Sequence, residues 1–127
     1  MDALLNVAAR ILMAQIFIIS GFSKITGYAG TQQYMESAGV PGVLLPLVIL
    51  TELGGGILLL LGFRTRLVAL LLAGFSLLSA LMFHLKPNDQ AQMINFMKNL
   101  AIAGGFLLFA QHGASAPSLD AAREGRP

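Results

Sequence analysis

Four long apolar stretches constrain the fold of this chain more than any other feature of its sequence. Each has close to the roughly 20 residues that an α-helix needs to cross about 30 Å of hydrocarbon. They cover residues 3–22, 43–61, 66–83 and 92–110. Because 56% of the 127 residues are hydrophobic and only 11% are charged, too little polar surface is left for a soluble globule. We therefore predict an all-α integral membrane protein, a four-helix up-down-up-down bundle.

Three of the four stretches include a charged residue that no choice of boundaries removes. Only 13 uncharged residues separate Arg10 from Lys24. That is about 20 Å of helix at roughly 1.5 Å per residue, so the first span contains Arg10. The same arithmetic places Lys98 in the fourth span, and Glu52 lies in the middle of the second. A lone carboxylate at mid-bilayer costs about 2.5–3.5 kcal/mol, so Glu52 is expected to have a basic partner.

The connection between the second and third spans determines the predicted orientation. Residues 62–66 contain two arginines and no acid, which the positive-inside rule places in the cytoplasm. An even number of spans then puts both termini on that side of a bacterial inner membrane. We expect one membrane domain, residues 1–112, and a flexible cytoplasmic tail, residues 113–127, with the composition of a mobile segment. A cleaved secretory signal is a weaker interpretation, because no basic leader precedes the apolar residues.

The first outer loop, residues 24–42, contains a predicted short interfacial helix over residues 31–37. Thr31 is expected to cap its N-terminus, and Gly39 with the following Pro41 is expected to end it. Tyr34 and Met35 are then expected to face the lipid headgroups. The segment is interpreted as an interfacial helix or a lid.

Each span has one face on which small or polar residues recur at intervals of three or four, and this face is expected to point inward. In the order of the spans, these faces comprise Arg10, Ala14, Phe17, Gly21 and Lys24; Val48, Glu52, Gly55, Gly56 and Leu59; Ala73, Leu77, Ala80 and His84; and Asn95, Lys98, Ala101, Gly105 and Leu108. The glycines at 54–56 and 104–105 are expected to let neighbouring helices approach closely.

Depth along the helices leads to a hypothesis about the partner of Glu52. Lys and Arg side chains extend about 6 Å along the helix axis, so either Arg10 or Lys98 is expected to reach the carboxylate. Lys24, His84 and Asn99 extend this polar cluster toward the outer face. One interpretation is a cationic funnel that binds an anionic or carbonyl-bearing small molecule, such as a quinone headgroup. The alternative is an ion pair that only fixes helix register and orientation.

Several other kinds of chemistry find no support in the sequence. The absence of cysteine excludes disulfides, thiol redox chemistry and iron–sulfur ligation by this chain alone. His84 and His112 are predicted at opposite sides of the membrane, which excludes a haem held by both. With so few acids and no cysteine, no metal site is expected. No phosphate-binding loop is present, and no nucleic-acid partner is expected.

A series of motifs extends over about residues 3–110. In chain order they are Ala-Arg-Ile-Leu at 9–12, Phe-Ile-Ile-Ser-Gly-Phe-Ser-Lys at 17–24, Gly-Val-Pro-Gly at 39–42, Glu-Leu-Gly-Gly-Gly at 52–56, Leu-Gly-Phe-Arg-Thr-Arg at 61–66, Phe-His at 83–84, Phe-Met-Lys-Asn-Leu at 96–100 and Gly-Gly at 104–105. In order and spacing these motifs resemble the DoxX family of small bacterial inner-membrane proteins.

This resemblance implies a four-helix inner-membrane protein. Its relatives would include the small membrane subunit of an archaeal thiosulfate:quinone oxidoreductase and a mycobacterial membrane partner in a thiol-redox and oxidative-stress complex. The recurrent polar positions of the family fall here on Arg10, Lys24, Glu52, His84, Lys98 and Asn99.

The function expected from the residues and the resemblance is a membrane subunit, or quinone-proximal component, of a redox or detoxification system. Catalysis by this chain alone is not expected, and a soluble redox subunit is the expected partner in addition to the bilayer. One alternative is a small transporter of a hydrophobic anion, which would require a homo-oligomer because four helices enclose little space. The other is a non-catalytic membrane scaffold.

Overall fold

The structure, a computed structural model, describes residues 2–125 and confirms the expected all-helical membrane fold. Within this part of the chain, four helical segments are long and apolar enough to cross a membrane. They are Asp2–Thr26, Gly42–Leu61, Thr65–His84 and Gln90–His112. Each predicted span lies within one of these segments.

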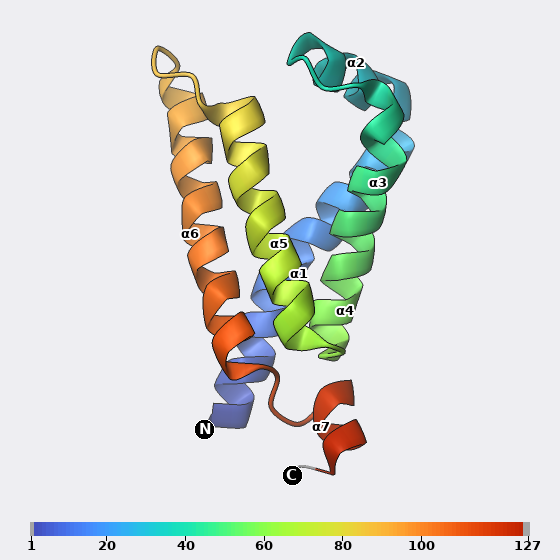
Figure 1. The fold of residues 1–127 in the computed structure, drawn as a ribbon, viewed down its shortest axis with the longest axis vertical. Helices are drawn as coiled ribbons and strands as arrows, with labels where there is room; N and C mark the ends of the chain where they lie inside the picture. Colours follow the sequence, from blue (N-terminus) through green and yellow to red (C-terminus); the bar gives the residue numbers. More distant parts are fainter. Residues whose placement is uncertain (1, 126–127) are drawn as a thin grey trace.

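The helical elements follow one another with short connections (Figure 1). In chain order they are α1 (Asp2–Thr26), α2 (Tyr28–Ser37), the 3₁₀ turn η1 (Gly42–Leu44), α3 (Leu45–Ile49), η2 (Leu50–Gly54), α4 (Gly55–Leu61), α5 (Thr65–Ser79), η3 (Ala80–His84), α6 (Gln90–His112) and α7 (Leu119–Glu124).

Two of the spans contain a π-helical turn, where regular α-helix was expected. The turn η2 carries Glu52, and η3 carries Phe83 and His84. A π-turn closes its hydrogen bonds over five residues instead of four, so it shifts the direction of the side chains that follow it. Hydrophobic periodicity does not reveal such a turn, because the surrounding residues are apolar on most sides.

The four spans form two arms that meet at one end and diverge at the other (Figure 1). One arm consists of α1 with α3 and α4, and the other consists of α5 with α6. We call the end near Asp2 and α7 the terminal end and the end near α2 the open end. The buried core fills the space between the arms in the terminal half. Within this core Phe17 packs against Phe106, with ring centroids 5.4 Å apart.

Glycines set the close approach of neighbouring helices in the middle of the bundle. An added Cβ at Gly21 would lie 2.9 Å from the backbone nitrogen of Leu53, and one at Gly56 would lie 3.2 Å from the carbonyl oxygen of Ala14. At Gly55 the neighbouring atom, at 2.9 Å, belongs to the side chain of Leu72 on α5. The expectation that glycines permit close packing is therefore confirmed at Gly55 and Gly56 but wrong at Gly104, where an added Cβ would meet no atom of a neighbouring element of the described chain within 4 Å.

The expected inward faces are correct for α1 and wrong for α6. In α1 the buried residues are Arg10, Ala14, Phe17 and Gly21, all on the expected face. In α6 the buried residues are Ala103, Phe106 and Phe109. Lys98, Ala101 and Leu108, which were expected to face inward, are exposed. Because α6 is apolar around most of its circumference, its sequence has no stripe to orient it, and the packing of Phe106 against Phe17 decides its rotation.

The short outer helix is present, but its details differ from the prediction. It begins at Tyr28, and Thr31 donates from its hydroxyl to the Gly27 carbonyl instead of capping the N-terminus. Gly39, at φ +82°, ends the segment as expected. Met35 is buried at 3% exposure instead of facing lipid headgroups, because it packs in a small core with Val40 and Leu45.

The described part of the tail, residues 113–125, contacts the spans, and its expected mobility stays a prediction. Arg126 and Pro127 lie outside the described residues. Asn6 donates to the Gly113 carbonyl and accepts from the Ser115 amide at 3.0 Å. The guanidinium of Arg10 donates to the Pro117 carbonyl at 2.5 Å. The α7 helix then lies against the α4–α5 turn, with Ala121 buried. Composition did not predict these contacts, because they depend on polar groups of distant helices.

Asp120 on α7 caps the first turn of α5. Its two carboxylate oxygens accept hydrogen bonds from the backbone amides of Arg64 and Thr65, at 2.7 and 2.8 Å. Burial raises the pKa of Asp120, but these amides and the charge of Arg123 together hold the pKa below its ordinary value of 3.8. The tail thus supplies a cap that the α5 sequence lacks, because Arg64 at the N-cap makes no side-chain cap bond.

The substitution Gly21→Ala is expected to lower the melting temperature of the detergent-solubilised protein, because the new methyl group would press on the Leu53 backbone. The matched control is Gly104→Ala on α6, where no atom of the described chain lies within 4 Å of an added Cβ. That substitution is expected to be neutral or stabilising, by up to about 1 kcal/mol of helix propensity. Equal melting temperatures for the two variants would contradict the proposed packing.

The substitution Asp120→Ala is expected to weaken tail docking by about 1 kcal/mol, the usual value of an N-cap. Hydrogen-exchange protection of residues 113–125 measures this loss, with Asn88→Ala at the open end as the control. Because the folded pKa is lowered, the cap is complete above the ordinary value of 3.8 and is lost as the pH falls through the folded pKa. Acid should therefore reduce protection in the unaltered protein more than in the variant. An equal loss of protection in acid for the unaltered protein and for Asp120→Ala would contradict the role of Asp120 as a cap.

Candidate ligand cavity

A cavity of about 470 Å³ lies between the two arms in the open half of the bundle. This volume falls within the range of small-molecule sites. Most of its lining is apolar, with residues contributed by α1, α2, the second span, the third span and α6. The polar or charged side chains on its wall are Ser20, Lys24, Thr31, Thr51, Glu52, Ser76, Ser79, His84 and Asn99.

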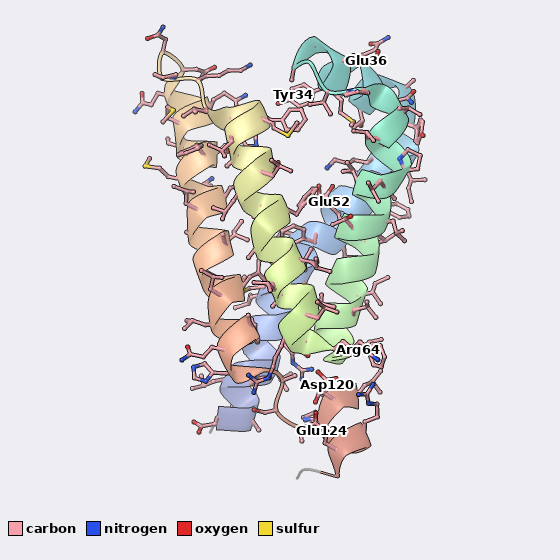
Figure 2. The ribbon with its side chains drawn as sticks, in the orientation of Figure 1. Tyr34, Glu36, Glu52, Arg64, Asp120 and Glu124 are labelled. Atoms are coloured by element: carbon pink, nitrogen blue, oxygen red, sulfur yellow. The ribbon has the colours of Figure 1, made fainter. Side chains whose placement is uncertain are left out.

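An ion pair between Lys24 and Glu52 is the most polar feature of the cavity. The ammonium nitrogen of Lys24 lies 2.7 Å from Glu52 Oε1 and also donates to the hydroxyl of Ser20 at 2.7 Å. Glu52 is buried at 5% exposure and projects into the space between the arms (Figure 2). The ion pair therefore combines a buried acid with a cation that is held in place by a third group.

The position of this ion pair follows from the contact between α1 and η2. Gly21 lies directly against the backbone of Leu53, the residue next to Glu52. Lys24 lies one helical turn beyond Gly21, so its side chain begins close to the carboxylate. A larger residue at Gly21 would push the two helices apart and lengthen the ion pair.

Arg10 and Lys98 do not pair with Glu52. The prediction that one of them would be its partner was therefore wrong. Arg10 is buried, but its guanidinium binds the carbonyls of Leu60 and Pro117 near the terminal end. It lies 11 residues before Gly21, about 16 Å along the helix, which is beyond the reach of its side chain. Lys98 is exposed on α6, on a face turned away from the cavity.

Three further polar groups lie on the third span and α6. His84 Nδ1 is 2.7 Å from Gln92 Oε1, so a neutral ring that donates to this oxygen carries its proton on Nδ1. Asn99 donates to the carbonyl of Ser76 at 3.3 Å. The Ser76 hydroxyl is buried and has no hydrogen-bond partner among the described residues, although it borders the cavity. The hydroxyl is therefore an unpaired donor beside the cavity, covered by its neighbours in the described protein.

Aromatic residues line the cavity at both ends. At the open end, Tyr34 of α2 stacks on Phe83 of η3, with ring centroids 5.4 Å apart and planes 19° from parallel. Figure 2 shows Tyr34 between the two arms at this end. At the opposite end, Phe17 and Phe75 form the floor, with centroids 6.3 Å apart. Tyr34 thus stacks on Phe83 at the rim of the cavity and is still 46% exposed, so its contact with lipid headgroups stays a prediction.

Of the six predicted site residues, Lys24, Glu52, His84 and Asn99 line this one cavity. The predictions missed Ser20, Ser76, Gln92 and Tyr34. The sequence could have predicted the role of Ser20, because Ser20 lies four residues before Lys24 on the same face of α1. The roles of the other three depend on contacts between elements and have no local signal. No group of three metal-ligating side chains occurs within residues 2–125.

Removal of one charge from the Lys24–Glu52 pair is expected to destabilise the protein more than removal of both. Lys24→Met and Glu52→Gln should each cost stability toward the lower end of the ~3–5 kcal/mol seen for buried ion pairs, because Lys24 is partly exposed. The double variant Lys24→Met with Glu52→Leu should recover part of that loss. Thermal unfolding in detergent measures it, with Lys98→Met as the control. A larger loss of stability in Lys98→Met than in Lys24→Met would support Lys98 as the partner of Glu52 and contradict the Lys24–Glu52 pair.

Comparisons with known proteins place the chain in one family. The sequence profile of the DoxX family matches residues 5–85. The inner membrane protein YqjF of Escherichia coli is 59% identical over 112 residues, covering 88% of this chain and 86% of YqjF. The inner membrane protein YphA of the same organism is 44% identical over 123 residues, covering 88% of this chain and 85% of YphA.

A more distant relative is CatD of Bacillus subtilis, which is described as a candidate oxidoreductase. It is 38% identical over 64 residues, covering 50% of this chain and 48% of CatD. No solved structure matches the chain. The family profile covers more than half of the sequence, and two inner-membrane relatives match most of it. The chain therefore belongs to the DoxX family and is a multi-pass inner-membrane protein.

Proposed function

We propose that this protein binds a lipid-soluble quinone in the cavity between its arms and acts as the membrane component of a redox or detoxification system. The observation that carries the proposal is the Lys24–Glu52 ion pair, with its buried carboxylate, on the wall of a largely apolar cavity of about 470 Å³. Buried charges inside a membrane are costly and are usually retained for function.

The chemistry of the lining fits a quinone headgroup. The carbonyl oxygens of a quinone accept hydrogen bonds, and the Lys24 ammonium and the Asn99 amide are donors. The covered Ser76 hydroxyl would become a third donor if its neighbouring side chains moved on binding. Phe17 and Phe75 offer apolar ring surfaces for a flat ring. When bound, the quinone supplies the capacity to take up electrons and protons. The residues of this chain would bind and orient it and hold a proton between Lys24 Nζ and Glu52 Oε1.

The closed floor of the cavity favours a binding site over a continuous passage. Below Phe17 and Phe75, the space between the arms is filled by buried residues that include Leu59, Leu72 and Phe106. Transport of an anion would require this packed half of the bundle to open. A ligand bound from one side needs no such change.

The proposal includes a separate source of electrons. The chain has no cysteine and therefore no thiol couple of its own. We infer that a soluble redox protein delivers electrons to the bound quinone. The description of CatD as a candidate oxidoreductase supports a redox setting, although CatD matches only half of this chain.

The test is binding of a decyl-substituted benzoquinone to the purified protein in lipid nanodiscs. The unaltered protein should bind it saturably, and Glu52→Gln and Lys24→Met should each weaken binding about tenfold or more, because a hydrogen bond to a charged group contributes roughly 1.5–3 kcal/mol. Glu36→Gln and Lys86→Met, in the loops of the open end, are charge-matched controls.

A third variant separates binding from folding. Ser76→Ala removes a hydroxyl that has no partner in the described protein, so it should leave the melting temperature unchanged and weaken quinone binding. Absence of saturable binding by the unaltered protein would remove the proposed function. Unchanged quinone affinity in Glu52→Gln, Lys24→Met and Ser76→Ala would also remove the proposed function.

A further inference from the structure

We propose that the cavity opens sideways into the hydrocarbon of the bilayer between α3 and α5, and that its ligand is an amphiphile whose apolar tail leaves through this opening. The inference rests on the proposed function and narrows its ligand to compounds that carry a lipid-like chain. The lateral opening is formed by Leu44 and Leu47 of the second span and by Leu78 and Met82 of the third.

The exposure of these residues locates the opening. Leu47 and Leu78 both line the cavity, yet they are 60% and 58% exposed. Further toward the terminal end, α4 and α5 are in close contact, where Leu72 fills the space beside Gly55. Figure 1 shows the two helices separating from that contact toward the open end. The wall of the cavity is therefore incomplete where the helices diverge.

The depth of the opening places it in hydrocarbon. Leu47 lies five residues inside the end of the span Gly42–Leu61, and Leu78 lies six residues inside the end of Thr65–His84. At about 1.5 Å per residue, these positions are roughly 7–9 Å below the ends of the two helices. A molecule that leaves the cavity here meets acyl chains, not water.

The charged pair and the leucines of the proposed rim come from different parts of the lining, although Ser76 and Ser79 of α5 also border the cavity. Lys24, Glu52 and Asn99 belong to α1, η2 and α6. The rim between α3 and α5 is lined by aliphatic and thioether side chains. A head bound at the ion pair would thus direct its tail toward this rim. A wholly polar ligand would leave the rim residues without a partner.

The route through the open end passes an aromatic stack. Tyr34 and Phe83 both line the cavity there, with ring centroids 5.4 Å apart. Met35, Val40 and Leu45 anchor α2 to the rest of its arm as a small buried core. A ligand dissolved in the bilayer reaches the lateral opening without displacing either contact.

The experiment uses single tryptophans, because the chain has none of its own. Leu47→Trp and Leu78→Trp place a bulky ring in the opening. Their matched controls are Leu50→Trp and Leu71→Trp, on the same two spans, which are 69% and 61% exposed and do not line the cavity. The probes are a decyl-substituted benzoquinone and the same ring without the chain, each added to protein in nanodiscs.

The opening variants are expected to weaken binding of the tailed probe about tenfold, the equivalent of roughly two buried methylene groups. Binding of the tailless ring should stay within about twofold of the unaltered protein, a margin of under 0.5 kcal/mol. Both controls should bind both probes normally. In nanodiscs with brominated lipid chains, the tailed probe should protect the tryptophans at 47 and 78 from quenching and leave those at 50 and 71 quenched.

Two outcomes would overturn the lateral opening while leaving the proposed function intact. One is normal binding of the tailed probe by both opening variants, with no protection from brominated lipid. The other is equal weakening of both probes, because the substitutions would then act on the head site. Failure of the unaltered protein to bind either probe would instead remove the proposed function, and the inference with it.

Discussion

The ion pair between Lys24 and Glu52 is the interaction on which the cavity depends. A carboxylate at this depth persists only with a cation beside it, and the cation is available because Gly21 lets α1 touch the backbone of η2. The pair therefore needs a backbone contact as much as it needs two charges. It also holds the first and second spans together as one arm, leaving the third and fourth free to diverge from it.

The two halves of the bundle are held together by different kinds of contact. In the terminal half, glycines and aromatic rings produce a packed core, and polar groups of the tail satisfy Arg10 and the start of α5. In the open half, the arms are joined mainly by the stack of Tyr34 on Phe83. A rigid half thus supports a half with space for a ligand. The two π-turns lie in the open half and present Glu52 and His84 to the cavity.

The charged residues of the spans were expected to form one cluster, but the structure places them in three different surroundings. Lys24 and Glu52 form the cavity pair, whereas Arg10 links α4 to the tail by donating to the carbonyls of Leu60 and Pro117. Lys98 is exposed on α6. Depth along a helix limits which groups can meet, but the rotation of each helix decides which of them do. This is why four of six predicted site residues share the cavity while the predicted partners of Glu52 do not.

The sequence by itself determined the membrane fold, the positions of the four spans and the inward face of α1, because hydrophobic length and helical periodicity are local properties. It also required a cation for Glu52. Only the tertiary structure decided which cation serves, how α6 is rotated, where the π-turns occur and how the tail docks. Each of these depends on contacts between segments far apart in the chain, and α6 is too uniformly apolar to encode its own orientation. The orientation of the termini across the membrane stays a prediction.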